Sequence, residues 1–93
     1  MNERRIKGRV VDVWNFRRGV VCYVMTLYED FDKKRRVFVH VPRAESDVMA
    51  LLDDAFFQGY VFSMMTLYEE LDCVMFVHKA KDFKVEDDVV DKK

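Results

Sequence analysis

The chain has 93 residues, a length that allows one domain with a modest hydrophobic core. Its residues are 51% hydrophobic and 35% charged, with three Gly and one Pro, which is typical of a folded protein rather than a disordered one. No apolar run approaches the roughly 18 residues of a membrane span, and residues 1–10 lack the apolar stretch of a secretory signal. We expect a cytoplasmic single domain over residues 1–93, with a core at about 4–83 and a frayed tail at 84–93.

Charge is unevenly distributed along the chain, although the formal net charge is only −1. Residues 1–43 hold eleven Lys or Arg against five Asp or Glu, which gives +6, whereas residues 44–93 hold five against twelve, which gives −7. The near-neutral total argues against a general nucleic-acid binder, but the split predicts a charged binding surface. If the fold places the two halves of the chain side by side, their opposite electrostatic potentials cancel.

Three strands are predicted in the first half, because β-branched and aromatic residues cluster between turn-forming residues. In chain order, the elements are a strand at 6–14, a turn at 15–19, a strand at 20–29, a turn at 30–34 and a strand at 35–41. Gly8 within the first strand predicts a bulge or a sharp bend. Gly19 can take the positive φ that a turn needs.

The third strand alternates between two kinds of side chain, as a half-buried strand does. One face carries Val37, Val39 and Val41, and the other carries Arg36, Phe38 and His40.

A helix and two further strands are predicted after Pro42. The apolar residues at helical spacing are Val48, Leu51, Leu52, Ala55 and Phe56. Ser46 is the expected N-cap and Gly59 the expected helix-ending residue. The later elements are a strand at 60–68, a turn at 69–72, a strand at 73–81 and a segment without a clear element at 83–93. The adjacent acids Asp53 and Asp54 are expected to face solvent.

A short internal repeat links the predicted hairpins. The segment VMTLYED at 24–30 is echoed by MMTLYEE at 64–70, and VFVH at 37–40 by MFVH at 75–78. The simplest account is two hairpins built alike. Two copies are too few for a solenoid.

The order of three strands, one helix and two strands resembles the OB-fold, the small Greek-key barrel that binds oligonucleotides and oligosaccharides. An Ile-Lys-Gly-Arg-Val opening at 6–10, a glycine closing the first loop and a helix between the third and fourth strands are all similar to that family, over residues 4–83. The resemblance implies a mainly β, five-stranded barrel with one helix. An open α+β sheet of two similar hairpins with a helix on one face fits the same element order.

The resemblance also implies a binding surface, on the face of strands two and three and on the loops that join strands one to two and four to five. Flat bases and phosphates require exposed rings interleaved with Arg or Lys. The residues expected to bind nucleic acid are Trp14, Phe16, Arg17, Arg18, Lys34, Arg36, Phe38 and His40, with Tyr23 or Tyr28 completing the surface. The same rings could instead pack in the core, and the acidic loop at 69–72 does not suit a phosphate.

We therefore expect a non-enzymatic protein that binds single-stranded DNA or RNA. The alternative is a protein-interaction or oligomeric module of OB type, with a homodimer or another protein as its partner, which is favoured by six Met and by the charge split. Catalysis is not expected, because His40 and His78 have no Ser, Cys or carboxylate at a telling spacing. No cofactor, metal or membrane partner is expected, and Cys22 and Cys73 are predicted to be reduced and buried.

Overall fold

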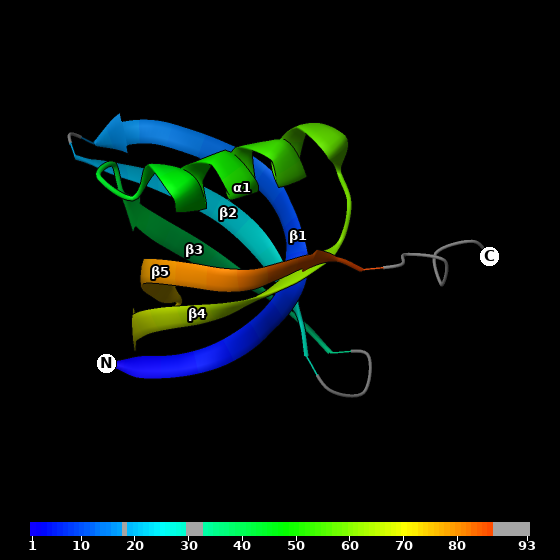
Figure 1. Ribbon diagram of the computed structural model, residues 1–93. Coiled ribbons are helices and arrows are strands. Elements are labelled where there is room, and N and C mark those ends of the chain that lie inside the picture. The colour runs from blue at the N-terminus through cyan, green and yellow to red at the C-terminus, as the bar shows by residue number, and fades with distance from the viewer. Residues whose placement is uncertain (18, 30–32, 87–93) are drawn as a thin grey trace.

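The computed structural model describes residues 1–17, 19–29 and 33–86, apart from the side chains of Phe16 and Arg17. Within these ranges, five strands and one helix follow one another along the chain. They are β1 (Asn2–Arg17), β2 (Val20–Tyr28), β3 (Lys34–Pro42), α1 (Ser46–Gln58), β4 (Phe62–Leu71) and β5 (Val74–Val85). The strands form a closed barrel in the order β1-β2-β3-β5-β4, in which only the β3–β5 pair is parallel (Figure 1).

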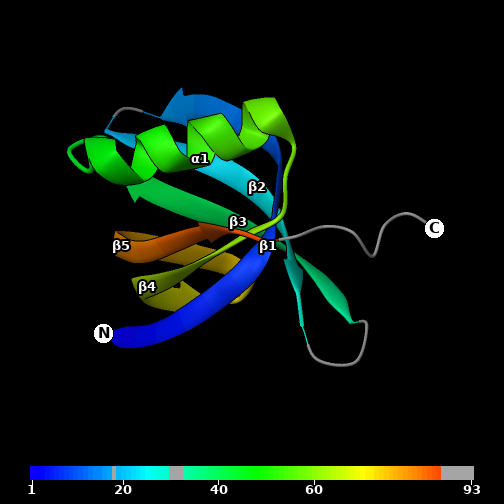
Figure 2. The same ribbon diagram turned by 45° about the vertical axis from the view of Figure 1, so that its right-hand side comes forward.

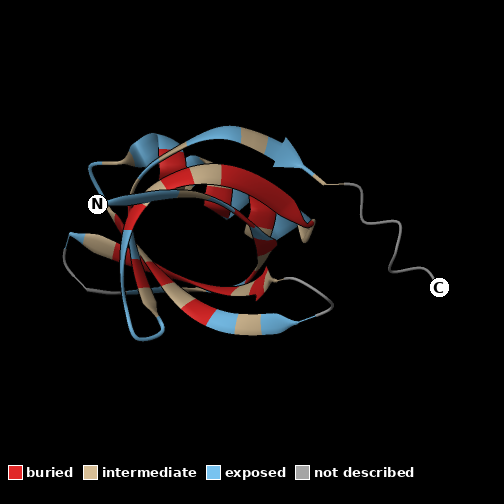
Figure 3. Ribbon diagram, turned by 90° about the horizontal axis from the view of Figure 1, so that it is seen from below, coloured by how far each residue is buried: buried red, intermediate tan, exposed pale blue. Residues whose placement is uncertain are grey.

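The barrel confirms the predicted fold class, mainly β with one helix between the third and fourth strands. It is compatible with an OB-like barrel. The alternative of an open sheet is wrong, because β1 pairs with β4 as well as with β2 and so closes the ring. Figure 3 shows this ring from below, with buried residues recurring along the strands.

β1 closes the barrel because it pairs with two strands in succession. Its first half pairs with β4, its second half pairs with β2, and Gly8 has a partner in each, Phe62 and Leu27. A Cβ atom at Gly8 would lie 2.2 Å from the backbone oxygen of Thr26, so the two strands can approach this closely only at a glycine. The two breaks in register of the β1–β2 pair lie further along β1, at Val11 and between Trp14 and Arg17.

Several strands are longer than the sequence suggested. β1 extends to Arg17, which leaves residues 18 and 19 between β1 and β2, and Gly19 has the expected positive φ of 77°. β4 extends to Leu71, so the turn to β5 begins at Asp72, with φ 58°. β5 continues past Lys81 to Val85. In each case pairing with a neighbouring strand outweighs the local preference of the residues for a turn or coil.

α1 lies across one end of the barrel (Figures 1 and 2). Its buried residues join the core; they are Val48, Leu52 and Ala55. The helix ends as predicted at Gly59, whose φ is 75° and whose N–H donates to the carbonyl of Ala55 at 2.8 Å. The prediction of Ser46 as the N-cap is wrong by one residue. Glu45 is the N-cap, because its carbonyl accepts the first helical hydrogen bond, from Met49 at 3.1 Å.

Two tyrosines donate to the exposed acids Asp53 and Asp54 of α1, Tyr23 from β2 and Tyr60 from the segment that leads from α1 to β4. The buried Tyr23 donates from its hydroxyl to Asp53 Oδ1 at 2.9 Å, and Tyr60 donates to Asp54 Oδ2 at 2.6 Å. Burial, reinforced by the neighbouring carboxylate, raises the pKa of Tyr23 above its ordinary value and that of Tyr60 to about 12. Both phenols therefore remain hydrogen-bond donors at neutral pH.

The two copies of the sequence repeat face opposite ways on β2 and β4. Met25 and Leu27 point into the core, whereas Met65 and Leu67 lie outside it and are only half-buried. In the second copy Thr66 points inward, and its hydroxyl is satisfied by a hydrogen bond of 2.9 Å to a backbone carbonyl of β1. A shift of one residue in strand register is enough to exchange the two faces. The hairpins are therefore not equivalent at these positions.

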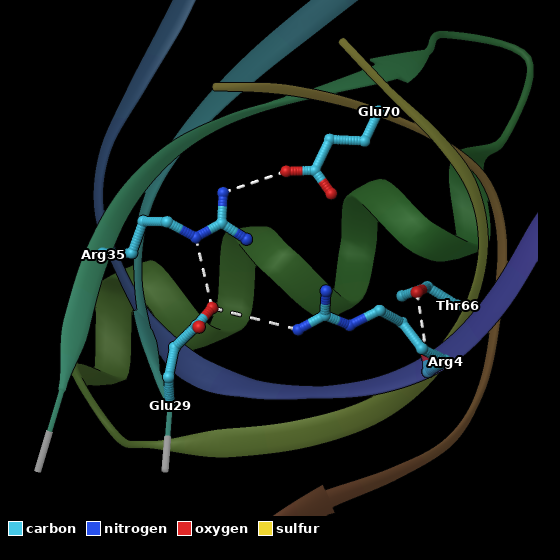
Figure 4. A network of polar contacts seen from close by, with 5 residues as sticks. All are labelled: Arg4, Glu29, Arg35, Thr66 and Glu70. Atoms are coloured by element: carbon cyan, nitrogen blue, oxygen red, sulfur yellow. Dashed lines mark hydrogen bonds and ion pairs between the residues drawn. The ribbon is translucent and has the colours of Figure 1, made fainter. Parts of the chain in front are cut away.

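A network of ion pairs fills the end of the barrel away from α1 (Figure 4). The Arg35 guanidinium bonds to Glu29 Oε2 at 3.1 Å and to Glu70 Oε2 at 2.9 Å, and Arg4 Nη2 lies 3.9 Å from the same Glu29 oxygen. These side chains are about two-thirds to three-quarters buried, so the pairs are partly shielded from solvent. The carboxylates of Glu29 and Glu70 thereby balance the positive charge of Arg35 at this end of the barrel.

The cysteines differ in environment. Both are free thiols, as expected. Cys22 is buried on β2, but the prediction of a buried Cys73 is wrong, because this residue lies in the exposed turn between β4 and β5.

Replacing Gly8 with Ala should destabilise the barrel, because the added Cβ meets a backbone oxygen that cannot move without displacing β2. We expect a loss of about 2–3 kcal/mol in the free energy of unfolding, measured by urea denaturation. The control is Gly19→Ala, because a Cβ atom at Gly19 would have no heavy atom within 4 Å. Only the positive φ would be strained there, so we expect this variant to lose about 1 kcal/mol in the free energy of unfolding. Equal losses for the two variants would contradict the close approach at Gly8.

Candidate nucleic-acid interface

The outer face of β1, β2 and β3 carries side chains in rows that are fixed by the strand register. From β1 to β3 the rows are Trp14–Cys22–His40, Asp12–Val24–Phe38 and Arg9–Thr26–Arg36. Cys22 and Val24 are only 1% and 3% exposed, although they lie outside the core cluster. The larger side chains of the flanking strands therefore cover them. Burial, together with the charge of Asp12, raises the pKa of the Cys22 thiol, which stays neutral.

Four rings gather on this face. The ring centroids of Trp14 and Phe38 are 5.6 Å apart at an interplanar angle of 35°, and those of His40 and Phe76 are 5.2 Å apart in an edge-on arrangement. Trp14 remains 43% exposed and Phe76 38% exposed. The strands β1, β3 and β5, which are distant in sequence, thus contribute to one partly open aromatic cluster, defined here as Trp14, Phe38, His40 and Phe76.

Asp12 fixes the orientation of Trp14. The indole Nε1 donates to Asp12 Oδ2 at 2.9 Å, while Asp12 Oδ1 accepts the backbone N–H of Val13 at 2.8 Å. With both carboxylate oxygens engaged, the indole is held by its polar edge while its ring packs against Phe38.

A basic groove of about 440 Å³ lies beside the aromatic cluster on the same sheet. It is lined by Arg9, Thr26, Tyr28, Lys34, Arg35 and Arg36. Lys34 Nζ sits 5.4 Å from the centroid of the Tyr28 ring, within the range of a cation–π contact. Arg36 and Phe38 are both outward residues of β3, two positions apart, which places their Cα atoms about 7 Å from each other. The groove and the rings therefore adjoin.

The structure brings five of the predicted binding residues onto this face. Trp14, Phe38 and His40 belong to the aromatic cluster, and Lys34 and Arg36 line the basic groove. Arg18 and the side chains of Phe16 and Arg17 lie outside the described part of the chain.

Of the two tyrosines proposed to complete the surface, Tyr28 lies on the outer face and Tyr23 is buried in the core. The alternation along β2 sets this, because Tyr23 shares the face of Met25 and Leu27.

Sequence reasoning missed three residues of the site, namely Phe76, Asp12 and Arg9. The repeat held a signal for Phe76, because it matches Phe38 in the repeated VFVH and MFVH segments and both face outward. The spacing of two residues on a strand was a signal that Asp12 and Trp14 share one face, whereas the break in register at Val11 turns that face outward. Arg9 reaches the loop after α1, where its guanidinium donates to the carbonyl of Gly59.

Glu69 and Glu70, which were expected in an acidic loop unsuited to phosphate, lie instead in strand β4. Glu70 pairs with Arg35 inside the barrel end, and Glu69 Oε2 lies 3.7 Å from His78 Nε2. Of the predicted acidic loop, only Asp72 lies in the turn between β4 and β5. Glu70 is thus turned away from the candidate face, whereas Glu69 pairs with Phe76 across β4 and β5 and stays at its edge.

No match to this chain was found among models of protein families, curated proteins or solved structures. Within the described residues, no helix is long and apolar enough to cross a membrane. The same part of the chain holds no group of three or more His, Cys, Asp or Glu placed to bind a metal ion.

Replacing Asp12 with Ala should loosen Trp14, because the indole N–H loses the carboxylate oxygen that accepts it at 2.9 Å, while the core is untouched. Trp14 is the only Trp of the chain, so its near-UV circular dichroism and fluorescence anisotropy report on this ring alone. We expect both signals to fall, with a stability loss of about 1 kcal/mol or less. Asp47→Ala on α1 is the matched control, and an equal spectral change in that variant would refute the assignment.

Proposed function

We propose that this protein is a non-enzymatic, OB-type domain that binds single-stranded nucleic acid on the outer face of β1, β2 and β3. The observation that carries the proposal is the adjacency of the exposed aromatic cluster and the basic groove on one sheet face. The strand order and the position of α1 support the OB assignment, since that family binds oligonucleotides on the corresponding face.

The chemistry of the two neighbouring regions suits the two parts of a nucleotide. Trp14 and Phe38 offer ring surface on which an unpaired base can stack, and Asp12 holds the indole so that little freedom is lost on binding. Arg36 and Lys34, one step away along β3, offer positive charge to the phosphate of the same or the next nucleotide. A duplex would present no free base faces to the rings.

The interaction should be of moderate strength and tolerant of sequence. Stacking contacts every base in the same way, and the groove has few cations. We expect a dissociation constant of about 10⁻⁵ M for a single strand of about 12 nucleotides at low salt.

Replacing Trp14 or Phe38 with Ala should weaken the binding of a labelled single strand about 5- to 150-fold, which corresponds to the loss of one stacking contact of about 1–3 kcal/mol. Fluorescence anisotropy of the oligonucleotide measures the affinity, and quenching of Trp14 in the unmodified protein reports contact at the proposed face.

The matched controls are Phe57→Ala, an exposed ring on α1, and duplex DNA of the same sequence. The Phe57 variant should bind the single strand as tightly as the unmodified protein does. The unmodified protein should bind the duplex more weakly than the single strand. No binding at about 100 µM protein would rule the proposal out, since non-specific binding alone is typically ~10⁻⁴–10⁻⁶ M.

The salt dependence tests the basic groove separately from the rings. With Arg9, Lys34 and Arg36 near phosphates, the logarithm of the affinity should fall with the logarithm of the salt concentration at a slope of about −2. Arg36→Gln should reduce this slope by about 0.7, whereas Phe38→Ala should lower the affinity without changing the slope. Lys84→Gln, on β5, is the control cation, and a change of slope in this variant equal to that of Arg36→Gln would contradict the assigned groove.

A further inference from the structure

A second outer face is formed by β5, β4 and the first half of β1, which lie side by side below α1 in Figures 1 and 2. Its rows, read from β1 to β5, are Glu3–Leu67–Lys79, Arg5–Met65–Lys81 and Lys7–Ser63–Lys84. Cations therefore flank a central strand whose outward residues are partly apolar. This face lies apart from the aromatic cluster and the basic groove.

A pocket of about 250 Å³ opens on this face. It is lined by Glu3, Met65, Leu67, Lys79, Ala80 and Lys81. The floor is apolar, because the reversed orientation of the second repeat copy turns Met65 and Leu67 outward. Lys81 Nζ lies 3.8 Å from Glu3 Oε2 and Arg5 Nη2 lies 3.9 Å from Asp82 Oδ2, and Ser63 donates to Glu86. The five cations of the rim, Arg5, Lys7, Lys79, Lys81 and Lys84, outnumber these three acids, so the rim is basic in sum.

The exposed side of α1 has the complementary character. Phe57 is 82% exposed, the highest value of any large hydrophobic residue in the described part of the chain. Asp47, Ala50 and Asp54 precede it at spacings of three and four residues, so they form one stripe along the helix, and Asp53 adds a further exposed carboxylate beside it. The helix has no basic residue in its last turn. The stripe is therefore acidic with one apolar side chain.

We propose that the pocket on β1, β4 and β5 binds α1 of a second copy of this chain, with Phe57 against Met65 and Leu67. Asp54 is one turn from Phe57, about 5 Å along the helix, and thus within reach of the lysines that border the floor. An apolar helix residue set in a groove with opposite charges around it is a common mode of recognition. The net charge of −1 leaves little general repulsion between copies.

The contact joins two different surfaces, so each copy offers one helix and one pocket. Such a heterologous interface extends from copy to copy unless the rotation closes a ring. The mass of the assembly should therefore rise beyond a dimer as concentration increases. The buried area is that of one helix face, which places the contact among weak, transient interfaces.

Sedimentation velocity of the full chain tests this proposal. In ~0.1 M salt, the weight-average mass should rise between about 10 µM and about 1 mM protein, as expected of a weak interface. Raising the salt to ~1 M, where the Debye length falls to about 3 Å, should shift the rise to at least threefold higher concentration. A strict monomer throughout this range would overturn the proposal.

Two variants and their mixture decide which surfaces meet. Phe57→Ser removes the apolar side chain of the helix and leaves the pocket intact. Leu67→Glu places a charge in the pocket floor and leaves the helix intact. Each variant alone should therefore be monomeric. Mixed in equal amounts, they should form a complex that stops at a dimer, because only one pairing remains possible. Association of Leu67→Glu alone, or no complex in the mixture, would overturn the proposal.

Leu71→Glu is the matched control, because Leu71 is a 69% exposed leucine of the same strand outside the pocket, and this variant should associate like the unmodified protein. Should Leu67→Glu unfold, the charge exchange Lys79→Glu with Asp54→Lys replaces it. Each single reversal should weaken association, and the double variant should recover it. Additive losses in the double variant would count against the contact.

Discussion

The double pairing of β1 is the constraint on which the rest of the structure depends. One strand must lie against β4 with its first half and against β2 with its second half, and at Gly8 it does both. The backbone of β2 approaches so closely there that no side chain fits. Without this crossing, the two hairpins would remain an open sheet, and neither outer face would exist in its present form.

Closure of the barrel also decides which residues become neighbours on its outside. The parallel pairing of β3 with β5 sets Phe76 against His40. The pairing of β2 with both β1 and β3 brings Trp14 to Phe38. On the other side, the same closure places Arg5 in one row with Lys81. The face on β1, β4 and β5 therefore draws on both halves of the chain, whereas the basic groove comes from residues 1–43 alone.

The orientation of β4 buries a polar side chain in the core and exposes apolar side chains on the outer face. Facing Thr66 inward buries a hydroxyl, which is compensated by a hydrogen bond to β1. Facing Met65 and Leu67 outward leaves apolar surface on a strand flanked by lysines. The face with the aromatic cluster carries rings and cations that are visible in the sequence, whereas the face with the apolar pocket arises only from this register of β4.

The sequence by itself determined the order of the elements, the helix end at Gly59 and the outward side of β3, because alternation, helical spacing and glycine are local signals. It also selected Trp14, Lys34, Arg36, Phe38 and His40 as residues of one surface. Only the tertiary structure decided the lengths of β1, β4 and β5, the inward side of β4, the place of Phe76 and the outward side of Asp12 and Trp14. These features depend on the register between strands that are distant in the chain, and local residue patterns do not encode that register strongly enough to fix it.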